Sequence, residues 1–399
     1  MKVYIITKEP FPNGMAATNR IQCYAKAIIS QGIECKVLIY TRTEVYGKKP
    51  KNIEGHGIID GIPFQYIGGT SLRDPNILIR QFNDYTDKYK INKFLKTNLQ
   101  EGDIVFGYNS CNAYFLNSII QTTHKKKSLF VRDLCELPYG TSTETKSTIK
   151  KRKFTLNKHI PLCDGIIAIS DSLVNLAKQY TSQMRVIKIP IMVDFEQYCI
   201  EDKSECIYPP YIFHSGTLYE QKDGVLGMIE AFGKAINKID QPIKFILTGN
   251  LEASPHSEKI RELITTYHLK DRLIFTGYLS STELKSYLSQ ASLVIINKYR
   301  TQQNEYCFST KLSEYLAASK PTIITNVGEA MNWLVDNKNA YIVEPERSDL
   351  LAMKIVEAFS DSFKRRNIAR NGKELCKTNF DYKVYGPKII SFLNTIKSL

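Results

Sequence analysis

Short runs of apolar and β-branched residues alternate with helical segments along almost the whole chain, in two separate series. In the first series the predicted strands are 2–7, 35–40, 64–67, 103–108, 128–132, 165–170 and 186–189. In the second series they are 211–214, 243–247, 272–275, 293–296, 322–325 and 340–343. Strands that alternate with helices form mainly parallel, doubly wound sheets, so the sequence predicts an α/β protein.

The two series are separated by a stretch that fits neither a strand nor a helix. Between residues 194 and 208 the alternation lapses, and Pro209-Pro210 prevents a helix from continuing. A chain of 399 residues also suits two cores better than one. We therefore predict two Rossmann-like domains, 1–200 and 201–380, facing each other across a cleft. In such domains ligands gather at the carboxyl ends of the strands.

Basic residues are divided unevenly between the two halves of the chain. Residues 1–200 hold 28 Lys and Arg against 17 Asp and Glu, a charge of +11. Residues 201–399 hold 26 against 23, a charge of +3. The asymmetry indicates an anionic partner for the first half, such as lipid head groups, a lipid diphosphate or nucleic acid. A well-solvated basic surface is the alternative.

One basic segment also contains apolar side chains. Between residues 143 and 159, six Lys and Arg accompany a single acid, Glu144, and Phe154, Leu156 and Ile160 lie among or beside them. Such a segment can lie on an anionic bilayer. A solvated helix face is the equal alternative.

Several features limit where the protein works and what it binds. No run reaches the roughly 18 apolar residues of a spanning helix, and the amino-terminal run is too short for a signal peptide, so we expect a cytoplasmic protein. The nine cysteines stand singly without zinc spacing, so reduced thiols are expected. The chain has no Asp-x-Asp to hold a divalent ion, and no motif indicates another cofactor.

The most informative local stretch, residues 304–325, indicates a loop, a helix and a strand in succession. Ser309 or Thr310 can cap the helix, and a β-branched strand follows Pro321. A helix amino terminus presents unpaired N–H groups and a partial positive charge, so residues 308–312 can hold a phosphate group. Glu314 suits a ribose diol, because one carboxylate accepts hydrogen bonds from two hydroxyls. The predicted nucleotide diphosphate site therefore consists of Phe308, Ser309, Thr310, Lys311, Leu312 and Glu314.

This helix carries a resemblance to a known family. The segment 308–321, FSTKLSEYLAASKP, resembles the donor-binding signature of family 4 glycosyltransferases from bacterial capsule and exopolysaccharide clusters. The resemblance implies the GT-B architecture, in which the final helix, here 381–398, packs back on the first domain. It also implies a nucleotide-sugar donor held by the second domain, an acceptor held by the first, retention at the anomeric carbon and no essential metal.

Further residues of the second half suit a diphosphate. Gly216 permits a tight turn after a strand, and Lys222, near a helix start, can meet phosphate oxygens. Many family members have an arginine where this chain has Thr217. Arg300 is the candidate replacement because its loop leads into the phosphate site, although a solvated arginine is the alternative. Lys222 and Arg300 would neutralise the leaving diphosphate.

The family pattern also concerns the base and a catalytic carboxylate. Gly277 and Tyr278 follow a strand end where, in the family, the backbone reads the base edge. Family members usually have two glutamates separated by seven residues, but eight positions before Glu314 stands Tyr306. Either Glu305 replaces the first glutamate by a local shift, or no carboxylate does.

The first half offers fewer specific residues. The loop 8–17, which contains Gly14, is a candidate wall of the cleft, and Arg20 in the next helix either reaches a phosphate or lies on the surface. Asp133 and Glu136 follow another strand and either orient acceptor hydroxyls or cap a helix. Family members often have a histidine near the position of Cys135, so no general base is assigned here.

The favoured function is a glycosyltransferase at the cytoplasmic face of the membrane, with a lipid-linked saccharide or a polysaccharide as its acceptor. A nucleotide-sugar epimerase on the same two-domain plan is the first alternative. The second is a non-catalytic protein that binds anionic membrane or nucleic acid, motivated by the basic first half and by Thr217, Cys135 and Tyr306. Nucleic acid is the weaker partner, because no aromatic-rich RNA-binding signature or basic heptad helix is present.

Overall fold

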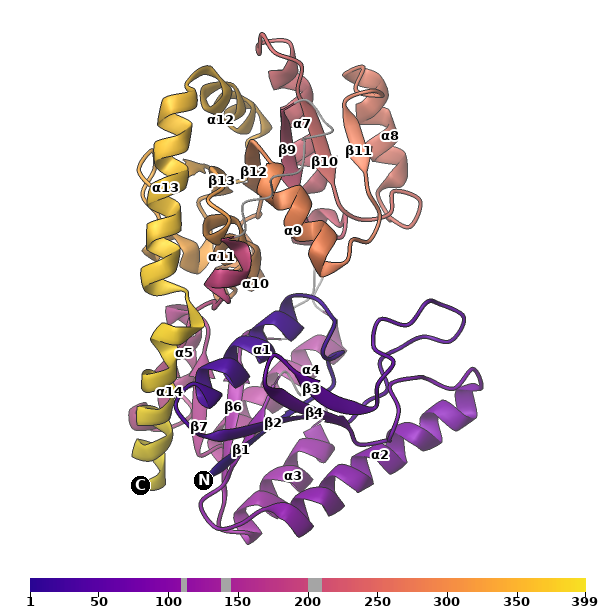
Figure 1. The fold of residues 1–399 in the computed structure, drawn as a ribbon, viewed down its shortest axis with the longest axis vertical. Helices are drawn as coiled ribbons and strands as arrows, with labels where there is room; N and C mark the ends of the chain where they lie inside the picture. The colour runs from indigo at the N-terminus through magenta and orange to yellow at the C-terminus, as the bar shows by residue number, and fades with distance from the viewer. Residues whose placement is uncertain (109–112, 138–144, 200–209) are drawn as a thin grey trace. The chain divides into compact units, whose positions relative to one another are not determined.

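The computed structural model describes residues 1–108, 113–137, 145–199 and 210–399, which form two compact units (Figure 1). The first unit consists of Met1–Val193 and Tyr382–Leu399, and the second of Asp194–Asp381. The first unit thus ends a few residues before the predicted position 200. Each unit has its own sheet and its own core.

An eight-stranded sheet in the order β3-β4-β2-β1-β5-β6-β7-β8 forms the centre of the first unit. Its neighbouring strands are parallel except for β3 and β4. The strands are β1 (Lys2–Thr7), β2 (Glu34–Ile39), β3 (His56–Ile59), β4 (Ile62–Tyr66), β5 (Ile104–Gly107), β6 (Leu129–Leu134), β7 (Gly165–Ala168) and β8 (Val186–Lys188). The helices are α1 (Ala16–Ile29), α2 (Ile77–Asn98), α3 (Ala113–Lys125), α4 (Lys146–Phe154), η1 (Thr155–His159), η2 (Ile160–Leu162), α5 (Asp171–Ala177), η3 (Gln183–Arg185) and α14 (Tyr382–Lys397).

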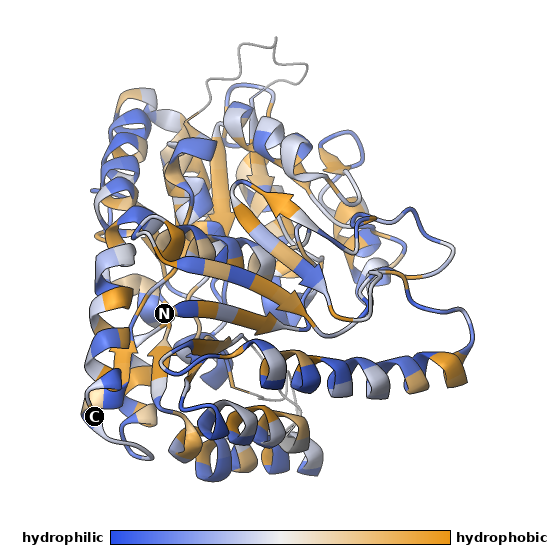
Figure 2. Ribbon diagram, turned by 60° about the horizontal axis from the view of Figure 1, so that its bottom comes forward, coloured by the Kyte–Doolittle hydropathy of each residue, from blue (hydrophilic) through white to orange (hydrophobic). Residues whose placement is uncertain are grey.

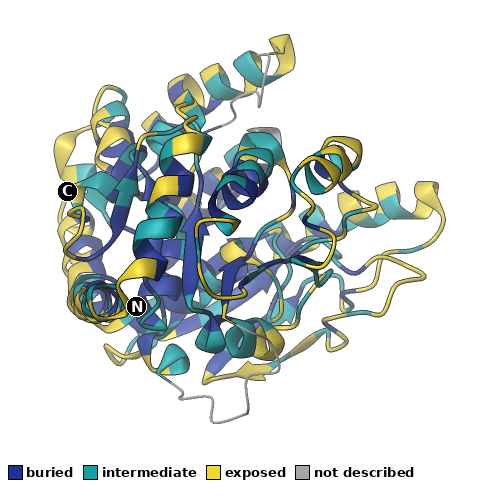
Figure 3. Ribbon diagram, turned by 90° about the horizontal axis from the view of Figure 1, so that it is seen from above, coloured by how far each residue is buried: buried dark blue, intermediate teal, exposed yellow. Residues whose placement is uncertain are grey.

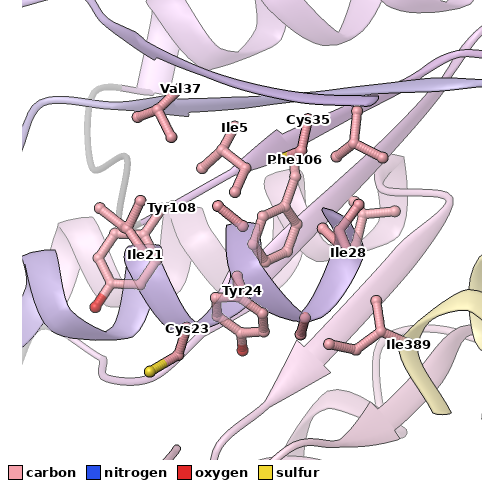
Figure 4. Packing of buried hydrophobic residues seen from close by; sticks show 14 of the residues in the cluster. Ile5, Ile21, Cys23, Tyr24, Ile28, Cys35, Val37, Phe106, Tyr108 and Ile389 are labelled. Atoms are coloured by element: carbon pink, nitrogen blue, oxygen red, sulfur yellow. The ribbon is translucent and has the colours of Figure 1, made fainter. Parts of the chain in front are cut away.

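The core of the first unit includes the end of the chain. Tyr24 of α1 packs edge-on against Phe106 of β5, with ring centroids 4.8 Å apart (Figure 4). Ile389 of α14 enters the same core, and α14 packs along α1. The prediction that the final helix packs back on the first domain is therefore confirmed.

The second unit is built on a six-stranded, wholly parallel sheet in the order β11-β10-β9-β12-β13-β14. The strands are β9 (Tyr211–His214), β10 (Lys244–Leu247), β11 (Leu273–Phe275), β12 (Leu293–Ile296), β13 (Thr322–Thr325) and β14 (Tyr341–Val343). The helices are η4 (Phe195–Tyr198), α6 (Glu220–Asp223), α7 (Val225–Ile236), α8 (Ser257–Thr266), α9 (Ser281–Gln290), α10 (Gln302–Tyr306), α11 (Thr310–Ala317), η5 (Gly328–Asn332), α12 (Ser348–Ser360) and α13 (Ser362–Asn379).

Hydrophobic strands explain why the sheets were predictable. The strands of both sheets are mostly hydrophobic (Figure 2) and mostly buried (Figure 3). The strand β3 was not predicted, because it is an exposed antiparallel edge strand whose residue Ile58 is 73% exposed. Within the described ranges, no helix is long and apolar enough to cross a membrane.

Candidate functional site

The loop after β9 makes a turn that only glycine fits. The N–H of Gly216 donates to Oγ1 of Thr248 at 2.7 Å, and that hydroxyl donates back to the carbonyl oxygen of Gly216 at 2.9 Å. A Cβ atom at position 216 would lie 2.4 Å from Nε2 of His214 and 2.9 Å from Oδ2 of Asp223. The predicted tight turn at Gly216 is therefore present, and it brings the backbone against two buried titratable side chains.

Asp223, at the end of α6, is the centre of a buried group of charges. Its side chain is 1% exposed, and its Oδ1 accepts a hydrogen bond from Nζ of Lys311. Its Oδ2 accepts from the N–H and the hydroxyl of Thr217, at 3.0 and 3.1 Å. Burial by itself would raise the pKa of Asp223, but the charges of Lys311 and Lys298 and the hydrogen bond from Lys311 hold it well below the ordinary value. We call these four residues, His214, Asp223, Lys298 and Lys311, the Asp223 cluster.

His214 is the neutral member of the Asp223 cluster. Its Nδ1 lies 2.9 Å from the carbonyl oxygen of Ile295, so Nδ1 carries the proton and donates. Its Nε2 lies 3.9 Å from Oδ1 of Asp223 and makes no hydrogen bond among the described residues. Burial, followed by the charge of Lys311, lowers the pKa of His214 to about 4. The imidazole is therefore uncharged at neutral pH.

Lys298, just after β12, adds a second cation to the Asp223 cluster. Its Nζ donates to the carbonyl oxygen of Lys222, and its N–H donates to Oγ1 of Thr325 at 2.7 Å. Burial, followed by the charge of Lys311, lowers the pKa of Lys298 to about 8. Lys298 holds the backbone of Lys222 in place, while the Lys222 side chain stays exposed.

The amino end of α11 has the form that an anion site requires. Ser309 occupies the N-cap position, but its side chain makes no capping hydrogen bond. The first turn therefore has no side-chain cap from Ser309 to satisfy its N–H groups. Lys311 in that turn pairs with Asp223, which anchors the start of α11 to the end of α6. An anion at this end would meet backbone donors beside a net positive cluster.

The predicted residues around this turn have different environments. The side chains of Phe308 and Leu312 are buried, and Phe308 packs edge-on against Phe380 with ring centroids 5.7 Å apart. These two residues therefore offer a ligand only their backbone, which is the part of them that the predicted phosphate site uses. Thr310 is half-buried, and Glu314, one turn into α11, is 8% exposed.

A pair of glycines holds two more loops together at the carboxyl edge of the sheet. Gly249 and Gly277, after β10 and β11, exchange backbone hydrogen bonds of 2.8 and 3.2 Å. Both have positive φ angles, +103° and +73°, which glycine adopts without strain. Tyr278 beside them is 55% exposed. Both the predicted base-reading turn and the α6 and α11 residues follow carboxyl ends of strands in one sheet.

Arg300 and Glu305 are not brought into the Asp223 cluster. Nη2 of Arg300 donates to the carbonyl oxygen of Asn326 at 3.1 Å and lies 3.8 Å from Oε2 of Glu344, and its side chain is exposed. Arg300 therefore lies outside the Asp223 cluster, whose second cation is Lys298, and its role at a diphosphate stays a prediction. Glu305 is half-buried in α10. The same helix packs closely against Gly328, because a Cβ atom at Gly328 would lie 2.5 Å from the carbonyl oxygen of Asn304.

In the first unit, Arg20 and Asp133 form a buried ion pair. Nη2 of Arg20 lies 3.1 Å from Oδ1 of Asp133, and both side chains are at most 2% exposed. The guanidinium also donates to the carbonyl oxygens of Ile189 and Pro190, at 3.0 and 2.7 Å. Tyr24 donates to the same carboxylate oxygen at 2.6 Å.

These contacts correct the predictions for the two residues. Arg20 lies neither on the surface nor within reach of a phosphate, because its donors are used inside the unit. Asp133 does not cap a helix, and its Oδ1 is occupied by Arg20 and Tyr24. Its Oδ2 makes no hydrogen bond among the described residues, so the role in orienting an acceptor hydroxyl stays a prediction. Glu136 is exposed. Local packing explains the glycine at position 14, because a Cβ atom there would lie 1.9 Å from Oγ1 of Thr18.

Sequence reasoning missed Asp223, His214 and Lys298. A carboxylate and a neutral histidine carry no sequence signal for an anion site, although His214 ends β9 and Lys298 follows β12 closely. Among the described residues, no group of three or more His, Cys, Asp or Glu is placed to hold a metal ion. The expectation that no metal is needed stays a prediction.

The architecture matches solved structures over the whole chain. A sucrose-phosphate synthase from Thermosynechococcus elongatus aligns with a TM-score of 0.73 at 14% identity, covering 100% of this chain and 99% of that one. Anabaena Alr3699/HepE in complex with UDP-glucose aligns with a TM-score of 0.70 at 15% identity, covering 99% and 100%. The fold is GT-B. The fold class predicted from the sequence is therefore confirmed.

The second unit also matches a sequence family. Residues 204–375 match Glycosyl transferases group 1. A capsular polysaccharide biosynthesis glycosyltransferase, CapM of Staphylococcus aureus, is 24% identical over 243 residues, which are 58% of this chain and 61% of that protein. The chain spans between 33% and 61% of the length of the curated relatives that it matches. The family match contains the Asp223 cluster and α11.

Proposed function

We propose that this chain is a retaining glycosyltransferase that moves a sugar from a nucleotide diphosphate sugar to a lipid-linked saccharide or a polysaccharide, without an essential metal. One observation carries the proposal. The start of α11, with no side-chain cap from Ser309, is fixed by the pair of Lys311 with buried Asp223, and Lys298 lies beside it. This arrangement concentrates backbone N–H groups and positive charge at the carboxyl edge of a parallel sheet.

The proposed catalytic role of these residues follows from the place where negative charge develops during the transfer. As the bond between the sugar and the diphosphate breaks, negative charge grows on the leaving phosphate. Preorganised donors aimed at that charge lower the barrier without needing to rearrange. In the proposal the first-turn N–H groups of α11 bind the diphosphate, Lys298 and Lys222 supply the charge, and Glu314 binds the ribose.

Asp223 positions the cations and does not react. Its carboxylate holds Lys311 and, through Thr217, the turn at Gly216. Because Lys298 and Lys311 together outnumber Asp223 in charge, the cluster remains net positive. Glu305 stays the proposed carboxylate near the sugar, and exposed Arg300 stays a candidate for the diphosphate.

The comparisons support the donor and acceptor classes of the proposal. Residues 204–375 match group 1 glycosyl transferases, and a structure of similar fold contains UDP-glucose. The CapM relative supports a role in cell-surface polysaccharide synthesis. We propose that this work takes place at the cytoplasmic face of the membrane.

A panel of nucleotide sugars tests the proposal. Each donor is incubated with the chain, with and without membrane extract as acceptor, and free nucleoside diphosphate is measured. We expect release with a small set of donors, faster with the acceptor and unaffected by a chelator. Conversion of a donor into a new sugar nucleotide without acceptor would instead identify an epimerase. No release and no binding of any donor would overturn the proposal.

A further inference from the structure

Helix α2 presents apolar side chains on the side that faces away from its own unit. Asp87, Ile91 and Leu95 are its buried residues. Opposite them on a 3.6-residue helix lies a row spaced by four, three and four residues. We call this row the α2 stripe; its members and their exposed fractions are Leu78 (72%), Phe82 (66%), Tyr85 (74%) and Tyr89 (66%).

The outward face of a surface helix is ordinarily polar. Here the first half of α2 is almost entirely exposed and extends to one side of the unit (Figures 1 and 3). A contiguous exposed apolar patch marks an interaction surface. The α2 stripe therefore has the character of an interaction surface.

The charges around the α2 stripe identify the kind of partner. By helical position, Lys93 and Lys96 continue the same face toward the carboxyl end, and both are exposed. The two acidic residues of α2 lie away from that face: Asp87 is buried and pairs with Arg42 at 3.2 Å, and exposed Asp84 lies on the Asp87 side by helical position. The face is apolar along its first half and basic along its second. An anionic, amphipathic partner complements it.

A pocket at the start of α2 also contains basic side chains, but it lies on the other side of the helix from the α2 stripe. It has a volume of about 240 Å³ and is lined in part by Arg42, Arg73 and Arg80, together with Ile77. Asp74 and Asp84 also line it. Nε of Arg73 donates to the carbonyl oxygen of Arg42 at 2.7 Å. Because Arg80 precedes buried Asp87 by seven residues, it lies on the same face as Asp87, and the pocket is not part of the docking surface.

We propose that α2 docks the protein on an anionic phospholipid bilayer. The α2 stripe lies at the boundary between head groups and acyl chains, where the amphipathic rings of tyrosine are stable. Lys93 and Lys96 face the head-group phosphates. This surface deepens the proposed location at the membrane and rests on that part of the proposed function, but it does not depend on sugar transfer.

Two other assignments fit the observations less well. A second copy of the chain would bring the lysines of two α2 helices together, and residues 1–200 carry +11, so like charges oppose that contact. The basic segment predicted from the sequence offers little apolar surface. The described part of it includes α4, but Leu156 and Ile160 are buried and Phe154 is half-buried; residues 138–144 lie outside the described residues. Its charges can add to the attraction, but α2 supplies the apolar contact.

Co-sedimentation of the full chain with vesicles tests the proposal. We expect binding to vesicles of equal parts phosphatidylglycerol and phosphatidylcholine, weak binding to pure phosphatidylcholine, and loss of binding as salt is raised. The double variant Phe82→Ser/Tyr85→Ser should lower the partition coefficient of the protein between vesicles and buffer by at least about tenfold. Lys93→Gln/Lys96→Gln should lower it by roughly tenfold.

A matched control separates the α2 stripe from exposed aromatic residues in general. Phe363 of α13 is 69% exposed, close to the value of Phe82, so Phe363→Ser should leave vesicle binding unchanged. Release of nucleoside diphosphate without acceptor should be unchanged in the α2 variants, which keeps this test separate from the proposed activity. Equal binding of the Phe82→Ser/Tyr85→Ser variant and the native chain would overturn the proposal. So would a dimer in solution that this variant converts to a monomer without any vesicle binding.

Discussion

Lys311 and Asp223 lie 88 residues apart in the chain and form an ion pair in which the carboxylate is 1% and the ammonium side chain 19% exposed. The pair fixes the first turn of α11 against the end of α6. Helix position, backbone donors and positive charge are thereby set before any ligand arrives. Such preorganisation is what electrostatic catalysis of sugar transfer needs.

Removing Lys311 should destabilise the second unit. Lys311→Met leaves the carboxylate of Asp223 buried without its main counter-charge, and we expect the free energy of unfolding to fall by about 3 kcal/mol. Urea unfolding measures this free energy. Asp223→Asn/Lys311→Met should recover part of the loss, because a neutral amide needs no cation. Lys222→Met, at an exposed neighbouring lysine, is the control; a Lys311→Met variant as stable as this control would contradict the account.

Stability should depend on the protonation of His214. Its ordinary pKa of 6.5 falls to about 4 in the folded chain. Between these values the unfolded chain takes up a proton that the folded chain excludes. The contribution of neutral His214 to the free energy of unfolding is therefore full above pH 6.5. It is lost as the pH falls toward 4, which lowers the free energy of unfolding by on the order of 3 kcal/mol.

Urea unfolding at a series of pH values checks this prediction. His214→Asn, which keeps a donor for the Ile295 carbonyl, should flatten the decline between pH 6.5 and 4. The same substitution at exposed His56 should leave the decline as it is in the native chain. If His214→Asn and His56→Asn show the same slope, His214 is not the group responsible.

Much of the fold was predictable from the sequence, whereas the charge network was not. Strands such as β1 and β12 consist of consecutive buried apolar residues, so the pattern of a parallel sheet is visible locally. The turn at Gly216 and the start of α11 were also predictable, because each is indicated by a few neighbouring residues. The pairs Lys311–Asp223 and Arg20–Asp133 depend on tertiary packing between distant segments, which leaves no local pattern. Arg20 in particular was expected at a ligand or the surface, because arginine is seldom buried without a partner.

Donor affinity should fall as the pH rises through about 8. Below that value Lys298 is a cation that favours the diphosphate, and above it the side chain becomes neutral. Calorimetric titration with the preferred nucleotide sugar, whose diphosphate ester charge is constant in this range, measures the effect. Lys298→Arg keeps the charge and should bind equally at pH 7 and pH 9. An unchanged decline in Lys298→Arg would assign the titration to another group.

Glu314 should matter to the donor and little to folding. Glu314→Ala removes charge-assisted hydrogen bonds to the ribose, so we expect transfer to fall by about tenfold or more. Nucleoside diphosphate release measures transfer, and thermal unfolding checks that the variant remains folded. Glu258→Ala, at an exposed glutamate in the first turn of α8, is the control. Native transfer rates in folded Glu314→Ala would remove the ribose role.

The position of a bound nucleoside diphosphate tests the central claim most directly. A crystal structure with the nucleoside diphosphate that is released by the preferred donor would locate both phosphates. The account predicts phosphate oxygens within hydrogen-bond distance of the backbone N–H groups of Thr310 and Lys311, with Lys298 nearby. Phosphates bound elsewhere, with the amino end of α11 in contact only with solvent, would contradict it.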